Sequence, residues 1–260
     1  MDDLEILVEE TEITSVEQFE QPDIDYLKGL KETSQKFLKV NDFEIKEPDF
    51  EDLTEEDFIN YFEDHTNEII LKKFEELNIP EDFRSSMSQI YTSKDEKSII
   101  FVYFLPTSKQ KTNVGIEVVK NFCKLIILLG CNEGIMISEK PLTSKSRESL
   151  ESSNVQSYCR DNIYNVISYT DDMFINVVDH CLTPEVLKIY SGKELEDFLK
   201  EENINSRDLP RMIISDPIAK FYRARVGDVI KMKRKTGNRD TLINEQIVYR
   251  VIIYGMVKKK

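Results

Sequence analysis

The chain has 260 residues, of which 40% are hydrophobic and 32% are charged, and its formal net charge at pH 7 is −14. This composition is typical of a globular chain whose core is large enough to fold without disulfides. The longest apolar run, "LIILLGC" at 125–131, is far shorter than the roughly 20 residues of a membrane span, so we expect no membrane contact. The N-terminus "MDDLEILVEE" is acidic where a secretory signal is basic, which predicts an intracellular protein.

The cysteine and histidine residues predict no metal site. Cys123, Cys131, Cys159 and Cys181 lie far apart and form no CxxC pair, which is typical of reduced, structural thiols. His180 is adjacent to Cys181, and this is a poor geometry for two ligands of one ion. The sequence also has no glycine-rich phosphate loop and only 8 glycines, so we expect no cofactor.

Charge is unevenly distributed along the chain. Residues 1–100 contain 10 Lys and Arg against 29 Asp and Glu, whereas residues 204–260 contain 14 against 5. One interpretation is two solvated faces of opposite sign. The other is a basic C-terminal module that binds an acidic partner, either protein or nucleic acid, and an acidic arm that avoids or mimics nucleic acid.

Residues 1–90 are expected to form an acidic, partly helical N-terminal extension. The sequence shows little hydrophobic periodicity up to about residue 55. From Thr54 to Leu77 apolar residues recur at helical spacing, and Thr54 is a candidate N-cap. The segment Asn78–Phe83 contains a proline and ends this helix.

Residues 91–173 alternate between strand and helix signals. Strands are expected in the three apolar runs Ser98–Pro106, Gly134–Ser138 and Asn162–Tyr169. A helix from Gly115 to a C-terminal cap at Gly130 is expected between the first two runs, and another starts with Thr143 or Ser144 as its N-cap. This order predicts an α/β domain with partly parallel strand pairing.

Residues 174–260 have a different pattern. Two extended pieces are expected within Ile175–Tyr190, followed by a helix with Ser191 and Glu194 at capping-box spacing. Asp216 is a natural N-cap, because Pro217 then occupies the first helical position. Strands are expected at 226–235 and 245–254, with a turn at "TGNRD" between them. The segment therefore predicts a small α+β module.

Four motifs in this module together resemble a known family. They read "LPR" at 209–211, "DPIAKFY" at 216–222, "GDVIK" at 227–231 and "YR" at 249–250. In this order they resemble the C-terminal assembly domain of the fifth subunit of eukaryotic RNA polymerases. Polymerases I, II and III share that subunit, and archaeal polymerases contain a counterpart of it.

The resemblance extends upstream to about residue 90, although it is weaker there. "VGIEVVKNFCKLI" and "LTSKSRESL" fall where the eukaryotic family has its jaw domain. The resemblance thus implies an α/β jaw domain of nuclease-like but inactive fold at 91–173, followed by the α+β assembly domain at 174–260. It implies a non-catalytic subunit of a DNA-directed RNA polymerase, located in the nucleus of a cell.

Three departures from the family pattern indicate a divergent copy. The second histidine of the family's H-x-L-x-P-x-H segment is Val186 here, and the proline of its jaw segment is Ser144. The last hairpin carries the longer insert "NRDTLINEQ". Such divergence fits a copy encoded by a large DNA virus, which would act in the host cytoplasm or the virion.

The resemblance also implies two sets of site residues. One set would dock on the largest polymerase subunit, beside the other polymerase subunits, with Phe221 and Tyr222 packing inward or into a partner. It comprises His180, Leu182, Pro184, Leu209, Pro210, Arg211, Asp216, Pro217, Ile218, Phe221, Tyr222, Gly227, Tyr249 and Arg250. The other set would lie near the phosphates of downstream double-stranded DNA. It comprises Lys140, Thr143, Ser144, Lys145 and Arg147.

Two other classes of protein stay open as alternatives. A metal-dependent nuclease of the restriction-endonuclease-like type needs an Asp followed by Asp/Glu-x-Lys, and the nearest candidate is Glu117 with Lys120. The spacing of that pair is one residue too long, and helical periodicity places it on a solvated face. A free acidic adaptor would instead bind its partner through residues 1–100.

Overall fold

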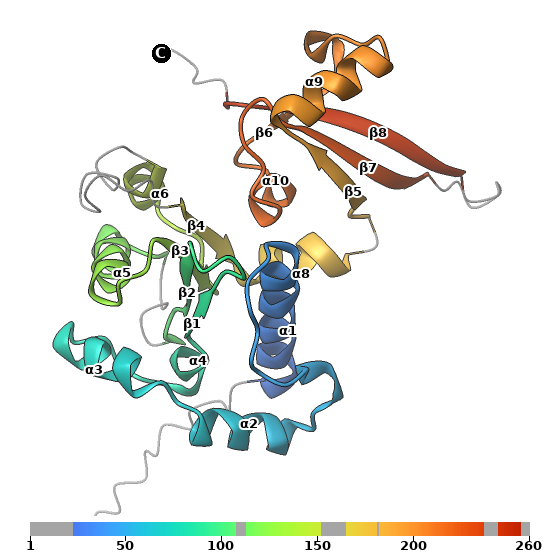
Figure 1. Cartoon of the computed structure of the whole chain (residues 1–260). Coiled ribbons are helices and arrows are strands. Elements are labelled where there is room, and N and C mark those ends of the chain that lie inside the picture. The colour runs from blue at the N-terminus through green and yellow to red at the C-terminus, as the bar shows by residue number, and fades with distance from the viewer. Residues whose placement is uncertain (1–22, 108–112, 152–164, 181, 237–243, 256–260) are drawn as a thin grey trace, which may run out of the picture.

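The computed structural model describes residues 23–107, 113–151, 165–180, 182–236 and 244–255, and within them it contains two four-stranded sheets (Figure 1). The helices are α1 (Ile24–Val40), α2 (Glu55–Asp64), α3 (Glu68–Glu76), α4 (Phe83–Ser86), α5 (Ile116–Leu128), α6 (Ser144–Glu151), α8 (Asp171–Asp179), α9 (Gly192–Glu201) and α10 (Pro217–Phe221), with 3-10 turns η1 (Phe50–Asp52) and η3 (Ser206–Asp208). The strands are β1 (Gln89–Thr92), β2 (Ile99–Phe104), β3 (Glu133–Ser138), β4 (Asn165–Thr170), β5 (Glu185–Tyr190), β6 (Arg211–Ile213), β7 (Val229–Thr236) and β8 (Asn244–Ile253). No helix in the described ranges is long and apolar enough to cross a membrane.

The first sheet has the strand order β1-β2-β3-β4. β1 is antiparallel to β2, whereas β2, β3 and β4 are parallel, so the prediction of partly parallel pairing is confirmed. Successive residues of a strand face opposite sides, and nearly all of β2 and β3 is buried on both sides. This explains why these strands read as continuous apolar runs.

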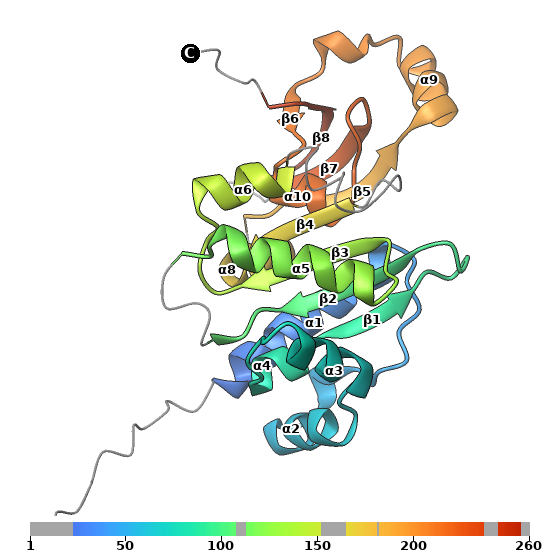
Figure 2. The ribbon, with the colours of Figure 1, turned by 90° about the vertical axis from the view of Figure 1, so that its left-hand side faces the viewer.

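Helices cover both faces of this sheet (Figure 2). Val102 and Ile135 face a cluster that also contains buried residues of α1, α2 and α8. Tyr103 and Met136 face a second cluster, which contains buried residues of α3 and α5. The predicted helix at 115–130 is therefore α5, and Gly130 follows its end with a φ of 68°, a conformation that glycine adopts without strain.

The N-terminal part of the described chain packs on the first sheet rather than standing apart from it. The low periodicity expected up to residue 55 is wrong for α1, whose Asp23 N-cap accepts a hydrogen bond from the Tyr26 N–H. Leu30, Phe37 and Leu38 are fully buried in the same cluster as Val102. The described residues between 23 and 90 thus supply α1 and α2 to the layer on one face of the sheet and α3 to the layer on the other.

The single helix expected over 54–77 is two helices in the structure. Thr54 caps α2 as predicted, since its hydroxyl accepts from the Asp57 N–H at 3.2 Å. Asn67 then caps α3 by accepting from the N–H groups of Ile69 and Ile70. An internal side-chain cap of this kind ends one helix and starts another, although the apolar spacing runs through both.

The second sheet has the order β5-β7-β8-β6. Ala219 of α10 packs on one face with Ile230, and Phe198 of α9 packs on the other with Val229. The two predicted strands of the last hairpin are β7 and β8, while residues 237–240 of the predicted turn lie outside the described residues. The expected capping box at Ser191 is wrong, because that side chain makes no cap hydrogen bond.

One segment between the two sheets differs from expectation. The first half of Ile175–Tyr190 was expected to be extended, but it lies in helix α8, and only β5 is extended. Phe174 and Val177 of α8 are buried against the first sheet. Their spacing of three residues is that of a helix face, and this contact outweighs the β propensity of the local Ile and Val residues.

The two sheets are joined through the side chains and main-chain carbonyls of α10. Phe221 is only 1% exposed and belongs to the hydrophobic cluster of the first sheet, where its ring lies edge-on 5.4 Å from that of Phe37. The amide of Asn41 donates to the Phe221 carbonyl at 3.0 Å, and the Tyr169 hydroxyl donates to the Pro217 carbonyl at 3.0 Å. The first sheet and the helix α1 packed on it are therefore direct neighbours of α10.

Candidate docking and nucleic-acid surfaces

The "LPR" motif leads the chain into the edge of the second sheet. Leu209 is buried between α9 and β7, and its neighbour Pro210 accepts a backbone hydrogen bond from Val251 at 2.9 Å. Arg211 then opens β6, opposite Val251, and its side chain is exposed. The motif thus anchors a short edge strand by one buried residue and presents the next two to solvent.

The "DPIAKFY" motif forms α10. The Asp216 carboxylate accepts from the Ile218 N–H at 2.9 Å, and Pro217 takes the first helical position, as predicted. Phe221 is buried as described above, while Ile218 and Tyr222 are partly buried against the chain's own clusters. These two rings were expected to pack inward or into a partner. Phe221 packs inward, whereas Tyr222 stays partly accessible.

The "GDVIK" and "YR" motifs build the middle of the sheet. Gly227 has a φ of 100°, which strongly favours glycine, and its N–H donates to the Ile252 carbonyl. Asp228 closes this turn by accepting from the Arg225 N–H at 2.7 Å. Tyr249 packs 5.2 Å from Phe198, and Arg250 lies opposite Ile230 in the β7–β8 ladder.

An apolar and basic strip results at the β6 edge, which we call the β6 strip (Pro210, Arg211, Ile213, Gly227 and Ile253). Ile213 is the register partner of Ile253 and is 45% exposed. Gly227 precedes β7 beside the end of β8, and Pro210, Arg211 and Gly227 are exposed. The strip combines an exposed apolar side chain with a guanidinium on an edge strand that pairs on one side only in the described sheet.

The "HCLTPEV" segment joins α8 to β5. His180 is exposed, and its Nδ1 accepts from the Leu182 N–H at 3.2 Å, which assigns the ring proton to Nε2 when the ring is neutral. Leu182 is 78% exposed and Pro184 is partly exposed. Val186 packs inward beside Met232, so an apolar side chain suits the place of the family's second histidine.

Several cations of the C-terminal module are balanced by acids of the same chain. Lys233 is paired with both Glu185 and Glu245, and Arg223 is paired with Glu133. Lys231 lies over the ring of Tyr249, with 5.7 Å between its Nζ and the ring centroid. This reduces the charge available to a nucleic acid on these strands.

The predicted DNA-proximal residues (Lys140, Thr143, Ser144, Lys145 and Arg147) lie on a segment that we call the basic loop. It starts after the carboxyl end of β3 and runs into the first turn of α6. Thr143 caps α6 by accepting from the Ser146 N–H, and its own N–H donates to the Val114 carbonyl, which fixes the loop to the start of α5. The Ser144 side chain is exposed, as are the cationic ones. These are Lys140, Lys145 and Arg147, of which Lys140 also pairs with Glu139 at 3.0 Å.

A buried ion pair that the sequence pattern did not predict supports this edge of the sheet. Arg84 donates to both carboxylate oxygens of Asp171 at 2.6 and 2.8 Å, and also to the carbonyls of Leu105 and Ile137. Burial raises the pKa of Asp171, although Arg84 acts in the opposite direction. The pair holds the ends of β2 and β3, from which the loops at this edge emerge. No sequence signal predicts it, because the partners are 87 residues apart.

The nuclease candidate residues do not form a site with other acids. Glu117 lies in the first turn of α5 and Lys120 one turn later, and both are exposed, as their helical spacing predicted. Within the described ranges, no three His, Cys, Asp or Glu side chains lie together in a way that could hold a metal ion.

Comparison with known proteins identifies the family. The family model described as "RNA polymerase Rpb5, C-terminal domain" matches residues 175–252. The chain is 38% identical over 77 residues to the DNA-directed RNA polymerase subunit Rpo5 of Methanothrix thermoacetophila, covering 92% of that protein and 30% of this chain. It is 42% identical over 83 residues to Rpo5 of Sulfurisphaera tokodaii, covering 90% of that protein and 31% of this chain.

A longer match reaches into the first sheet. The chain is 21% identical over 165 residues to subunit RPABC1 of DNA-directed RNA polymerases I, II and III of Caenorhabditis briggsae, which covers 64% of this chain and 74% of that protein. The chain belongs to the Rpb5 family of RNA polymerase subunits. The resemblance drawn from the four motifs is thereby confirmed.

Proposed function

We propose that this chain is a non-catalytic subunit of a multisubunit DNA-directed RNA polymerase and that it docks on the largest subunit through the β6 strip. The observation that best supports docking through this strip is that Ile213 and Arg211 are both exposed within the segment that matches the Rpb5 C-terminal domain. An apolar centre with a polar rim is the usual anatomy of a protein interface, and arginine is enriched in such interfaces. His180, Leu182 and Pro184 would extend this contact from the other edge of the sheet.

The two sheets would have separate roles in the polymerase. The second sheet would attach the subunit to the assembly, and the first sheet would serve as the jaw, holding downstream duplex DNA near the basic loop. Phosphoryl transfer would belong to other subunits. In a eukaryotic cell such a subunit would act in the nucleus; a viral copy would act in the host cytoplasm or virion.

Docking is tested by the double change Arg211→Glu with Ile213→Asp. Both side chains are exposed, so the fold should persist, but the two substitutions would change the net charge of the strip by −3 and remove the apolar contact. We expect recovery of the polymerase with tagged subunit to fall at least tenfold, measured by affinity purification and mass spectrometry.

The matched control for docking is Arg234→Glu with Ile247→Asp, on the same sheet. Ile247 is 43% exposed, close to the 45% of Ile213, but it lies six residues from Ile253 along β8, roughly 20 Å at the rise of a strand. Full recovery of polymerase by the β6-strip variant would contradict the proposal. Recovery of an unrelated partner by residues 1–100 alone would favour a free adaptor.

The DNA contact is tested by Lys145→Glu with Arg147→Glu in assembled polymerase. Both side chains are exposed on α6, and a contact with two phosphates contributes a counterion-release slope of about −0.9 per phosphate. We expect the plot of log affinity for downstream duplex against log salt to become shallower by about 1–2. An unchanged slope would show that these two side chains do not contact phosphates.

A further inference from the structure

The outer edge of β1 is paired along only part of its length. The Glu44 N–H donates to the Thr92 carbonyl at 2.9 Å, and the Lys94 N–H donates to the Asp42 carbonyl at 2.8 Å, so residues 42–44 begin a new strand there. The pairing stops at Ile45, whose side chain turns into the core of the first sheet. β1 therefore continues as an edge beyond the point where its neighbour leaves.

The alternation of an antiparallel pair shows which backbone groups this leaves open. The Ser93 N–H donates to the Ser98 carbonyl, so the backbone of Ser93 faces β2 and that of Thr92 faces away from it. By the same alternation, Tyr91 faces β2 and Ile90 faces outward. The Ile90 N–H and carbonyl and the Thr92 N–H thus point away from the sheet, and they find no partner in the described part of the chain.

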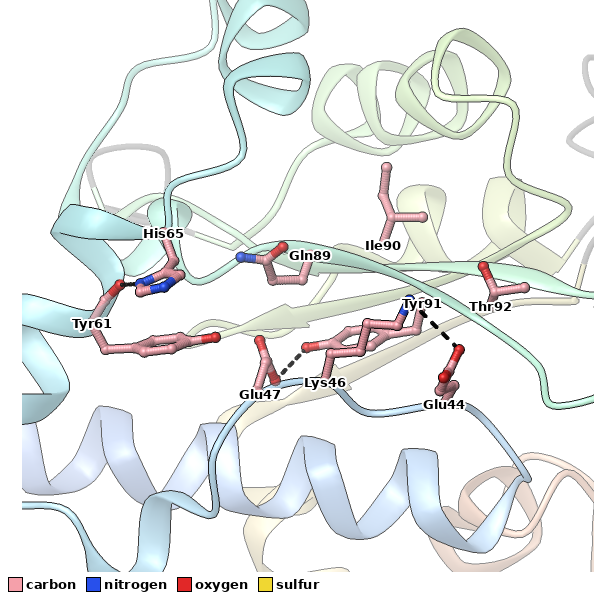
Figure 3. Close-up of a pocket in the computed structure, with 9 residues that line it drawn as sticks. All are labelled: Glu44, Lys46, Glu47, Tyr61, His65, Gln89, Ile90, Tyr91 and Thr92. Carbon is pink, nitrogen blue, oxygen red and sulfur yellow. Dashed lines mark hydrogen bonds and ion pairs between the residues drawn. The ribbon is translucent and has the colours of Figure 1, made fainter.

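A groove of about 380 Å³ runs beside these groups (Figure 3). One wall is residues 89–92 of β1, and the opposite wall is the diverging segment 44–47. Tyr61 of α2 and His65, which follows that helix, close the far end, where their rings stack 4.4 Å apart. The floor is polar, because the Tyr91 hydroxyl donates to the Glu47 carboxylate at 2.8 Å.

The charge around the groove favours a basic occupant. Glu44 is exposed at the mouth, and Lys46 beside it lies 3.8 Å from the Glu44 carboxylate. α2, which ends at the groove, carries five acidic and no basic residues. A lysine- or arginine-rich segment would be attracted, whereas an acidic one would be repelled.

We propose that this groove is a strand-addition site for an extended, basic polypeptide segment of a partner protein. The segment would pair with β1 along the part of the strand that residues 42–44 leave unpaired. It would exchange backbone hydrogen bonds with Ile90 and present a carbonyl that accepts from the Thr92 N–H, which is the usual mode of β-augmentation. Its cationic side chains would lie toward Glu44 and α2.

The test uses the full chain and a fluorescein-labelled hexapeptide of alternating lysine and valine. We expect fluorescence anisotropy to show saturable binding that weakens with salt, and at least tenfold weaker binding of the matched glutamate–valine peptide. Amide exchange followed by NMR should slow at least tenfold at Ile90 on adding the basic peptide. The Tyr91 amide, which already faces β2, should change little.

Two variants separate the backbone and charge contributions. Ile90→Pro removes the outward N–H without breaking a bond to β2, since proline is tolerated on an edge strand in that orientation, and should abolish binding. Glu44→Lys should weaken it at least fivefold, and it carries the test if the proline variant fails to fold. The matched control Glu196→Lys, an exposed acid on α9, should bind as the unaltered chain does.

Three results would overturn the proposal. The first is equal binding of the acidic peptide, and the second is binding without added protection at Ile90. The third is slow exchange of the Ile90 amide in the free chain, because it would mean that the chain itself or a second copy already covers the edge.

Discussion

Replacing Lys31 by methionine is expected to destabilise the protein by about 3–5 kcal/mol, the usual cost of breaking a buried ion pair from one side. Lys31 is fully buried in α1, and its ammonium contacts the Glu47 carboxylate at 2.9 Å. The same ammonium donates to the Met87 carbonyl and the Tyr91 hydroxyl. Methionine fills a similar volume but leaves the Glu47 charge buried without its cation. Urea denaturation followed by circular dichroism measures the loss.

The double variant Lys31→Met with Glu47→Gln separates charge from packing. The glutamine retains an acceptor for the Tyr91 hydroxyl and carries no charge, so we expect at least half of the lost stability to return. A double variant as unstable as Lys31→Met would show that the loss comes from packing against the surrounding rings rather than from the unpaired carboxylate.

The Lys31 pair also predicts a pH dependence. Burial lowers the pKa of Lys31 below its ordinary 10.5, while Glu47 acts against that shift. A lowered pKa means that the unfolded chain holds the proton more tightly, so the unfavourable contribution of the buried charge declines as pH rises toward 10.5. The stability difference between the unaltered chain and Lys31→Met should therefore increase through this alkaline range. A constant difference would contradict the lowered pKa.

Phe221→Ala is expected to cost about 3–5 kcal/mol and to loosen the junction between the two sheets. The ring is 1% exposed and lies between Phe37 of α1 and Phe174 of α8, at centroid distances of 5.4 and 6.1 Å. Its loss opens a cavity where the two halves meet. Amide exchange by mass spectrometry should accelerate in α1, α8 and α10, while β2 and β3 retain their protection.

The control for this prediction is Tyr222→Leu, the next residue along the chain. Tyr222 is partly exposed and packs at the margin of the same cluster, so a loss of about 1 kcal/mol or less is expected. If Phe221→Ala cost no more than this control, the ring would not be central to the junction.

Local signals predicted those parts of the fold where neighbouring residues decide the structure. β2 was predicted from its apolar run, and α10 from Asp216 and Pro217, whose capping contacts span two residues. α1 was missed because its buried face includes Lys31, Ser34 and Gln35, and these polar residues interrupt the apolar spacing. Their burial depends on partners that lie far away in the sequence.

The candidate surfaces were predicted unevenly for the same reason. Motif resemblance identified the residues of the second sheet, but it could not distinguish Phe221, which packs within the chain, from Arg211, which is exposed. The Arg84–Asp171 pair and the open edge of β1 arise from tertiary contacts alone. Neither residue type nor spacing near Arg84 or Ile90 indicates them.

The hydrogen bonds that join the two sheets have a consequence for how the sequence can vary. Asn41 and Tyr169 both donate to main-chain carbonyls of α10 rather than to its side chains. Every residue type supplies such an acceptor, so these two bonds depend on the path of the helix backbone and not on which amino acids it carries. Surface substitutions in α10 can therefore accumulate without altering the angle between the first sheet and the second.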